Sequence, residues 1–374
     1  MQKKTWVITG ILAAILIGGG VWLVKRKQPT VNQVQLGAIL PLTGNLAILG
    51  EPGRNALTLG REDLQGQGQN IDIKFYDSQA NPTVGVTAFQ RAADVDGVKF
   101  TLTTLTGVSS AIKPIANSRN IFQGMVAIAP NMVDGSNSAV RFCFNGADEA
   151  KAMMNRIKGS NLKEVFILWS RDGATEPEVN QYLKPALNES QIKFEEETFD
   201  VGQKDFKGQI LKLKASGMKD VILLGYGSDF PGILKEMSTQ GVFDQVRIVG
   251  GIGYLELPGY VGYDLVKNAV FISPAFLVQS EANDQSKAFM RRYKEKFSTE
   301  VTYDAAYTYD ALMILAEAFK NAGGADPVSV RNYILKKGTF QGVTGTLSFQ
   351  PNGEVVSPLT TARYNGSMIM EKIQ

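Results

Sequence analysis

The chain has 374 residues, 44% of them hydrophobic and 20% charged, so it is long enough to bury two hydrophobic cores and too apolar for long disorder. The first 27 residues hold five of the 39 basic residues and no acid, so the remainder, with 34 basic and 36 acidic residues, lacks the basic footprint of a nucleic-acid-binding protein. The absence of histidine excludes Ser-His-Asp and Cys-His catalysis and histidine-ligated zinc, and the single cysteine, Cys143, excludes an internal disulfide.

The N-terminal segment 1–27 has the pattern of a membrane anchor or a signal. Trp6 to Val24 is an apolar stretch of 19 residues with Lys3-Lys4 before it and Lys25-Arg26-Lys27 after it. This length is enough for a helix that spans a bilayer. A cleaved signal peptide with a shorter apolar core is the alternative, because Gly18-Gly19-Gly20 offers small residues for cleavage. A short polar linker at 28–33 follows.

The next stretch predicts the first half of a βαβ unit. Val34–Leu40 is a short apolar run of β-formers, and Pro41 and the turn residues Thr43-Gly44-Asn45 end it. From Gly50 to Leu64 apolar residues recur at helical spacing. The loop between strand and helix lies at the carboxyl end of the strand, where open α/β sheets bind ligands.

Strand-like and helix-like stretches alternate along the rest of the chain. Helical spacing is seen, for example, at 84–93, 176–187, 206–215 and 232–239. The predicted strands are Val34–Leu40, Ile71–Tyr76, Lys99–Thr103, Met125–Ala129, Glu164–Trp169, Ile192–Phe199, Val221–Gly225, Gln245–Val249 and Ala269–Ile272. Such alternation predicts an α/β fold with parallel sheets covered by helices on both faces, and this number of strands fits two sheets better than one.

Two serines are candidate ligand contacts from their position alone. The predicted strand Lys99–Thr103 is followed by a turn and a helix that we expect to begin at about Ser109. Free N–H groups of a first helical turn, together with the hydroxyl of Ser109 or Ser110, form a natural site for a carboxylate or carbonyl oxygen. A serine that only caps the helix is the alternative.

Several motifs together resemble the leucine/isoleucine/valine-binding protein family. They are Pro41-Leu42-Thr43-Gly44, Asp77–Pro82, Val98–Ser110, Asp205-Phe206, Tyr303–Ala306 with Tyr309–Ala311, and Phe340–Phe349 with Asn352-Gly353. They follow the family's order and cover almost all of the chain after the linker. Members of this family are extracytoplasmic solute receptors with the type 1 periplasmic-binding fold.

The resemblance implies two doubly wound lobes joined by a hinge of three crossings. Lobe 1 would comprise 34–146 and 273–356, and lobe 2 would comprise 147–272 and 357–374. The ligand would lie in the cleft between them. The part after the linker would face outward from the cell membrane, held by the single-pass anchor, or would be secreted or periplasmic if the segment is cleaved.

The resemblance also implies ligand contacts, and the chain departs from the amino-acid receptors at some of them. Ser109 and Ser110 would contact ligand. Leu49 replaces an aromatic residue, Asn131 and Val133 lie where a threonine is used, and Ile252 lies where a glutamate holds the ammonium group. Losing that acid predicts a ligand that is not a standard zwitterionic amino acid, although an amino-acid-like molecule, an amide or an acid remain open.

Further candidates follow the predicted strands of lobe 2. Trp169, Arg171, Tyr226 and Tyr254 could close on a ligand, and Tyr303 and Asp304 could line the hinge side of the cleft. Packing within the lobe is the alternative for Trp169, a solvated loop for Arg171, and a helix N-terminus for Tyr303.

The sequence therefore predicts a binding protein rather than an enzyme. It contains neither a G-x-S-x-G elbow nor a phosphate-binding G-x-x-x-x-G-K-[ST] loop, and no cofactor or metal is expected. We expect a receptor that delivers a small molecule to the permease of an ABC importer of the branched-chain amino acid/amide class. A membrane-anchored sensory protein that signals to a partner is the alternative.

Overall fold

The computed structural model describes residues 34–44, 46–257, 265–266, 269–323, 325–365 and 370–373. The strands are β1 (Val34–Leu40), β2 (Ile71–Asp77), β3 (Phe100–Thr104), β4 (Phe122–Val126), β5 (Ala139–Arg141), β6 (Glu164–Ser170), β7 (Lys193–Phe199), β8 (Asp220–Leu224), β9 (Arg247–Gly250), β10 (Ala269–Pro274), β11 (Thr339–Gly342), β12 (Gly345–Phe349), β13 (Val355–Val356), β14 (Leu359–Tyr364) and β15 (Met370–Lys372). The α-helices are α1 (Ala47–Gly66), α2 (Pro82–Gln90), α3 (Thr106–Ser118), α4 (Gly146–Gly159), α5 (Thr175–Pro177), α6 (Lys184–Glu189), α7 (Lys207–Ser216), α8 (Phe230–Thr239), α9 (Asp284–Phe297), α10 (Tyr303–Asn321) and α11 (Pro327–Lys337).

The predicted membrane segment Trp6–Val24 and the linker after it lie outside the described residues. Within the residues that the structure describes, no helix is long and apolar enough to cross a bilayer.

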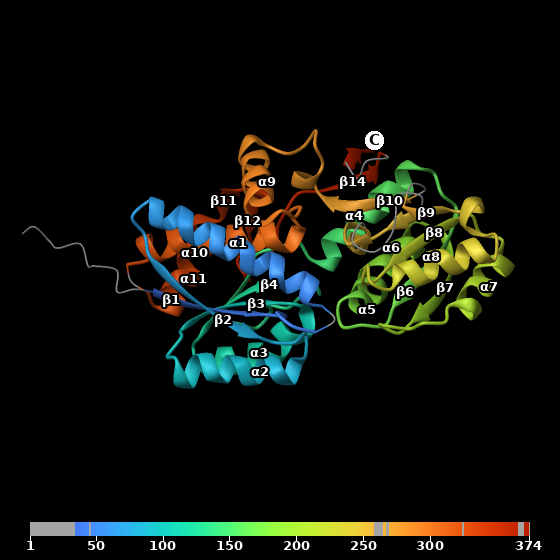
Figure 1. Cartoon of the computed structure of the whole chain (residues 1–374). Helices are drawn as coiled ribbons and strands as arrows, with labels where there is room; N and C mark the ends of the chain where they lie inside the picture. The colour runs from blue at the N-terminus through green and yellow to red at the C-terminus, as the bar shows by residue number, and fades with distance from the viewer. Residues whose placement is uncertain are drawn as a thin grey trace, which may run out of the picture. The chain divides into compact units, whose positions relative to one another are not determined.

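The first sheet has five parallel strands in the order β2-β1-β3-β4-β5. Helices α1 and α10 cover one face, and α2 and α3 cover the other (Figure 1). Alternate residues of β1 explain this layering, because Ala38 and Leu40 pack with the α1–α10 side and Ile39 packs with α2 and α3. We call this sheet with α1, α2, α3, α9, α10, α11 and the small sheet β11-β12-β13 lobe 1.

The second sheet has seven strands in the order β15-β14-β10-β9-β8-β6-β7, and β6 to β10 are parallel. Ile210 of α7 and Ile233 of α8 pack on one face, and Met153 of α4 and Leu187 of α6 pack on the other. Parallel sheets were predicted, and in this sheet only β14 runs against its neighbours, because it pairs antiparallel with β10 on one side and with the edge strand β15 on the other. The chain enters β14 beside the end of β10, at Pro274, and therefore runs back along it. We call this sheet with α4 to α8 lobe 2.

The chain passes between the lobes three times, between β5 and α4, between β10 and α9, and between β13 and β14. The second passage follows Pro274, which still pairs with Leu359, so lobe 2 extends slightly past the expected boundary at 272. The sequence resemblance implied three passages, and their action as a hinge stays a prediction.

One predicted strand was misplaced. Strand β4 ends at Val126, whereas we expected a strand over Met125–Ala129. The carbonyl oxygens of Ala127 and Ala129 instead accept hydrogen bonds from the guanidinium group of Arg141. A buried side chain thus satisfies backbone groups that a longer strand would have paired.

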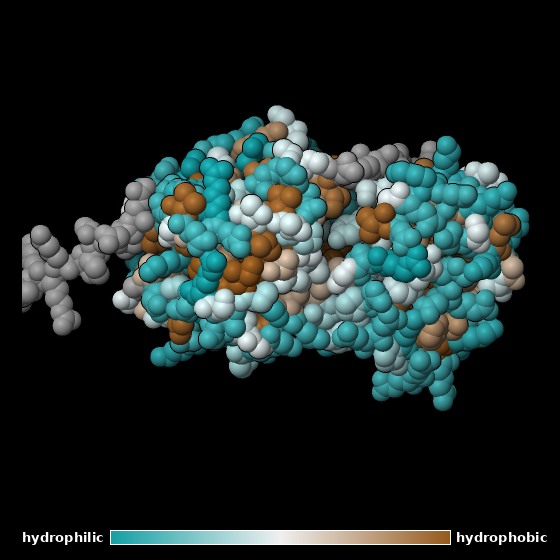
Figure 2. Space-filling view, turned by 90° about the horizontal axis from the view of Figure 1, so that it is seen from below, coloured by the Kyte–Doolittle hydropathy of each residue, from teal (hydrophilic) through white to brown (hydrophobic). Residues whose placement is uncertain are grey.

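Hydrophilic residues cover most of the face shown in Figure 2, and they break its hydrophobic residues into separate patches. The large apolar side chains with most exposure lie on different elements. They are Ile48, Val95, Val201, Leu211 and Val356. Apolar residues scattered in this way are normal for a protein surface and do not indicate a docking site.

Candidate functional site

The lobe 1 side of the candidate site is the junction between β3 and α3. Leu105 adopts a left-handed conformation with φ 67°, so the chain turns sharply and α3 begins at Thr106. Our prediction that the helix begins at Ser109 was wrong, because the first intrahelical bond already runs from Ser109 N to Leu105 O (3.0 Å). The N–H groups of the preceding turn have no intrahelical acceptor and remain available to a ligand.

The two predicted serines lie on different sides of α3. Ser109 is fully buried, and its hydroxyl oxygen lies 2.8 Å from Oγ1 of Thr103, while its carbonyl accepts a bond from Gln123 Nε2 (3.0 Å). Ser110 is exposed. No side chain caps α3, so the capping alternative for Ser109 was also wrong. The hydroxyl of Ser109 instead ties α3 to β3 inside lobe 1.

Thr106 holds the position that we expected for the serines. Its Oγ1 accepts a hydrogen bond from the N–H of Ala129 (3.3 Å), and the side chain is 7% exposed. A Cβ placed on Gly173 of lobe 2 would lie 3.8 Å from Cγ2 of Thr106. The first residue of α3 therefore faces the other lobe directly.

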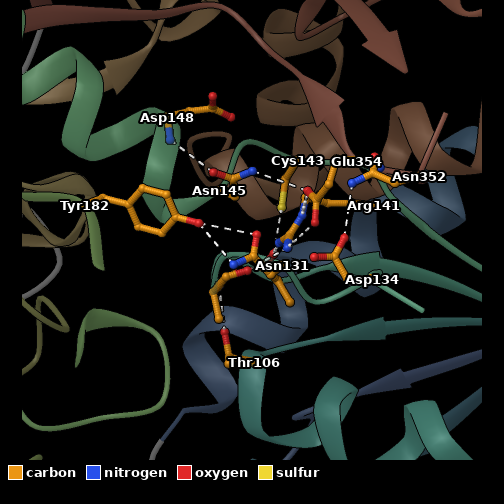
Figure 3. A network of polar contacts seen from close by, with 12 residues as sticks. Thr106, Asn131, Asp134, Arg141, Cys143, Asn145, Asp148, Tyr182, Asn352 and Glu354 are labelled. Atoms are coloured by element: carbon orange, nitrogen blue, oxygen red, sulfur yellow. Dashed lines mark hydrogen bonds and ion pairs between the residues drawn. The ribbon is translucent and has the colours of Figure 1, made fainter. Parts of the chain in front are cut away.

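Asn131 also bridges to lobe 2, by a hydrogen bond, whereas the candidates Val133 and Leu49 are buried apolar residues. The amide Nδ2 of Asn131 donates to the hydroxyl oxygen of Tyr182 at 3.0 Å (Figure 3). Asn131 has a left-handed backbone with φ 59°, which asparagine tolerates. Val133 is fully buried in an apolar cluster that includes Ala174 of lobe 2, and Leu49 is 7% exposed on α1.

Three of the lobe 2 candidates are engaged within lobe 2. Trp169 belongs to its core and donates from Nε1 to Glu196 (2.8 Å), in agreement with the packing alternative. Arg171 forms an exposed two-pronged pair with Asp200 at 2.8 and 3.0 Å. Tyr254 is fully buried between aromatic rings, with the ring of Phe271 stacked 5.9 Å away.

Tyr226, Ile252 and Tyr303 gather around carboxyl groups. Tyr226 is partly buried after β8, and the next residue, Gly227, donates its N–H to Glu256 Oε2 (2.9 Å). The hydroxyl of Tyr303, from α10 of lobe 1, donates to Glu256 Oε1 (3.4 Å). The N–H of Ile252 donates to Glu149 Oε1 (2.6 Å). A glutamate therefore lies against Ile252 through its backbone, although position 252 itself is apolar.

Six carboxyl groups surround this meeting place, and we call them the acidic cluster. They are Glu149, Asp172, Glu178, Asp229, Glu256 and Asp304. Burial raises the pKa of Glu149 and of Glu256 to about 7. Burial also raises the pKa of Glu178 well above its usual range, reinforced by the charges of Glu149 and Asp172.

Carboxylates of the acidic cluster also affect the pKa of Tyr226. Burial, followed by the carboxylates of Asp172, Glu256, Asp304 and Asp229, raises the pKa of Tyr226 above its usual value. Tyr226 is therefore a neutral phenol that can donate a hydrogen bond or pack against a ligand. The candidate site combines an acidic wall from lobe 2 and α10 with the free N–H groups at the start of α3.

A buried network lies beside two of the hinge passages (Figure 3). Arg141, at the end of β5, is fully buried and pairs with Glu354 (Nε to Oε2, 2.6 Å), which precedes β13. Asn145 donates to the same carboxylate at 3.3 Å. Cys143 is buried next to Arg141, and burial raises its thiol pKa to about 12, as expected for an inert side chain. The network ties the first passage of the chain to the third.

Sequence reasoning missed Thr106 and, apart from Asp304, the residues of the acidic cluster. The carboxyl groups come from α4, α10 and four loops or helix starts, and each resembles an ordinary surface acid in its own sequence context. Asp304 was singled out with Tyr303 for the hinge side of the cleft, but not as a member of a group of carboxyl residues. Asp172, Asp229 and Glu256 each follow a predicted strand closely, at the edge where α/β sheets bind ligands.

Comparison with known proteins gives a consistent result. A family model described as periplasmic binding protein matches residues 33–367. Leu/Ile/Val-binding protein homolog 1 of Brucella suis is 25% identical over 370 residues, which is 96% of this chain and 95% of that protein. A leucine-, isoleucine-, valine-, threonine- and alanine-binding protein of Pseudomonas aeruginosa is 24% identical and is matched over 95% of both chains.

Solved structures share the fold. A leucine-binding protein of Thermotoga maritima has a TM-score of 0.83 at 22% identity, covering 91% of this chain and 98% of that one. A solute-binding protein of an ABC transporter from Rhodopseudomonas palustris, in complex with 3,4-dihydroxybenzoic acid, has a TM-score of 0.80 at 19% identity, covering 89% and 93%. At this identity the likeness concerns the fold alone.

Proposed function

Because the chain belongs to the periplasmic binding protein family, whose model matches residues 33–367, we propose that it closes its two lobes on a solute and delivers it to an ABC permease. It is a solute-binding protein of the branched-chain amino acid ABC transporter type, and its relatives are binding proteins rather than enzymes. The observation that supports the proposal is that Thr106, Asn131 and Tyr303 of lobe 1 each lie against a residue of lobe 2, namely Gly173, Tyr182 and Glu256.

The mechanism follows from these contacts. Thr106, at the start of α3, contacts the solute from lobe 1 through its hydroxyl group. Tyr226 and the acidic cluster bind from the opposite lobe. Contacts between lobes, such as Asn131 with Tyr182, favour the closed form, and a solute that touches both lobes shifts the population toward it. The permease then recognises the closed form.

The solute itself is set by the site and not by the fold. The similar structures include one in complex with isoleucine and one in complex with benzoate. Here, Ile252 and Val133 have apolar side chains where amino-acid receptors were expected to use a glutamate and a threonine. We propose that the solute differs from a standard zwitterionic amino acid, and that Asn131, Tyr226 and Tyr303 remain its contacts among the predicted residues.

A thermal-shift panel on the purified full chain tests this function. A solute at 100 times its dissociation constant adds about 2.7 kcal/mol of stability, which is a readily measured shift. We expect at least one small solute to stabilise the protein, and leucine, isoleucine and valine to do so weakly. Thr106→Val should reduce the shift, whereas Ser110→Ala, on the exposed side of the same helix, should not. Strong stabilisation by leucine would contradict the proposed solute class.

The anchor gives a separate prediction about location. We propose that Trp6–Val24 remains as a single-pass anchor, with the C-terminal part extracytoplasmic. A reporter that is active only outside the cytoplasm, fused after Gln374, should be active, and the protein should stay with membranes after a salt wash. Release of a fragment that starts near Val21 would favour the signal peptide, and an inactive reporter would contradict both readings.

A further inference from the structure

Some carboxyl oxygens of the acidic cluster accept no hydrogen bond from the described residues of the protein. Asp172, Asp229 and Glu256 follow β6, β8 and β9, so the carboxyl ends of neighbouring strands bring them to one edge of the lobe 2 sheet. Asp304 reaches the same place from α10 of lobe 1 and raises the pKa of Tyr226 together with them. The cluster is thus built by both lobes.

Several carboxylate oxygens of the cluster lack a partner within the part of the chain that the structure describes. They are Asp172 Oδ2, Glu178 Oε1, Asp229 Oδ2 and Asp304 Oδ2. Glu178 is 3% exposed and Asp229 is 5% exposed, so water does not solvate their side chains freely. Two of these side chains are held in place by their other oxygen: Asp229 Oδ1 accepts from the N–H of Gly202 (2.8 Å), and Asp172 Oδ1 accepts from the N–H groups of Ala174 (2.8 Å) and Thr175 (3.0 Å). A buried carboxylate oxygen without a donor is costly, and it is accounted for if a bound molecule supplies the donor.

The charge of the site indicates whether the bound molecule is a cation or an anion. The strongest charges acting on Tyr226 are carboxylates, and those acting on Glu178 are Glu149 and Asp172. Lys204 acts on Asp229 and is the basic group that offsets the cluster from its edge. An anionic solute would be repelled here, whereas a cation would pair with groups that are already desolvated.

We infer, building on the proposed receptor function, that the solute is a small organic cation with more than one N–H donor, such as an alkyl diamine or an alkyl guanidine. The unpartnered oxygens lie on separate elements, so a single donor could not satisfy them all. An ammonium or guanidinium group reaching Asp229 and Asp304 would also bridge the two lobes. Such a solute would favour closure by neutralising carboxyl groups that face each other across the hinge.

Proton release on binding gives a second test of this inference. Glu256, with its pKa raised to about 7, faces Asp229 of lobe 2 and Asp304, Tyr303 and Tyr226 around it. A bound cation stabilises the charged form of a carboxyl group and lowers its pKa. Binding near neutral pH should therefore release protons, and affinity should rise as the pH increases from about 6 to about 8.

Calorimetry of the purified full chain tests the inference with diaminobutane and agmatine as cationic probes. Leucine, benzoate and hexanamide are the zwitterionic, anionic and neutral comparisons. We expect the better cation to bind at least about tenfold more tightly than any comparison. Titrations in two buffers of different ionisation enthalpy should reveal proton release with the cations alone.

Substitutions locate the binding. Glu256→Gln keeps an oxygen for the N–H of Gly227, and we expect it to weaken cation binding about tenfold. If Glu256→Gln fails to fold, Asp172→Asn is the second test variant, because it keeps an oxygen for the N–H groups of Ala174 and Thr175. Asp200→Asn removes an exposed acid of the same lobe outside the cluster and should leave affinity unchanged.

The outcomes separate the inference from the function on which it rests. Tight binding of leucine, benzoate or hexanamide with weak binding of both cations would overturn the inference and leave the receptor function standing. Cation binding that resists Glu256→Gln and Asp172→Asn would place it elsewhere and also overturn the inference. Failure of every solute to bind would overturn the inference and count against the receptor function as well.

Discussion

Replacing Arg141 with methionine is expected to lower the free energy of unfolding by about 3–5 kcal/mol. The guanidinium group is fully buried, pairs with Glu354 through Nε (2.6 Å) and Nη2 (3.1 Å), and donates to the carbonyl oxygens of Ala127 and Ala129. Methionine fills much of the volume but leaves a carboxylate and two carbonyl groups without their donor. The loss of those bonds, rather than a cavity, causes the destabilisation.

Urea unfolding measures this effect, with Arg171→Met as the matched control. Arg171 forms a pair of the same kind with Asp200, but that pair is exposed, so we expect a loss of about 0–1 kcal/mol. Adding Glu354→Gln to Arg141→Met should recover part of the stability, because it removes the unpaired charge. Equal losses for the Arg141 and Arg171 variants, at unchanged slope of the unfolding curve, would contradict the structural role of the buried network.

The stability of the protein is expected to fall by several kcal/mol as the pH rises from about 5 to about 8. Burial raises the pKa of Glu149 and Glu256 from 4.5 to about 7, so the folded protein binds more protons than the unfolded chain in this window. The stability that the protonated groups contribute is present below the unfolded pKa and is lost as the pH passes the folded pKa. Each unit of pKa difference corresponds to about 1.4 kcal/mol. Asp310, with its pKa raised to about 6, acts in the same direction.

Chemical denaturation at several pH values, without added solute, measures this dependence. Glu256→Gln should flatten it because an amide does not titrate, whereas Asp200→Asn should leave the slope unchanged. A stability that is constant or rises with pH would show that the acidic cluster is not buried as the structure has it. Because the sign is opposite to that of paired surface carboxylates, the two situations are easily distinguished.

The sequence allowed the fold to be predicted because periodicity and order are local properties. Alternating strands and helices from Val34 to Ile272 gave parallel sheets covered on both faces, and the family motifs gave the lobes. The start of α3 was not predictable, because Leu105 adopts a left-handed backbone that nothing in its side chain favours. Because of that error we chose Ser109, which is buried inside lobe 1, whereas Thr106 begins the helix and faces lobe 2.

The candidate site was harder to predict because its parts are far apart in the chain. Tyr226 and Tyr303 were singled out from their positions. Glu256, which accepts hydrogen bonds from the hydroxyl of Tyr303 and from the N–H of Gly227 beside Tyr226, is 47 residues from Tyr303 and belongs to lobe 2. Ile252 suggested a site without an acid, since a pattern of side chains does not reveal that its backbone N–H holds Glu149. Tertiary structure supplies acids that an aligned position lacks.

The central claim is that the chain is a receptor that retains one solute between its lobes. Native mass spectrometry of the full chain, purified without denaturation, tests it most directly. We predict a species heavier than the chain by one small molecule, which disappears in Thr106→Val and is released as an identifiable solute on unfolding. The account would be contradicted if the purified chain had its unaltered mass, if no solute stabilised it, and if no added solute increased its mass.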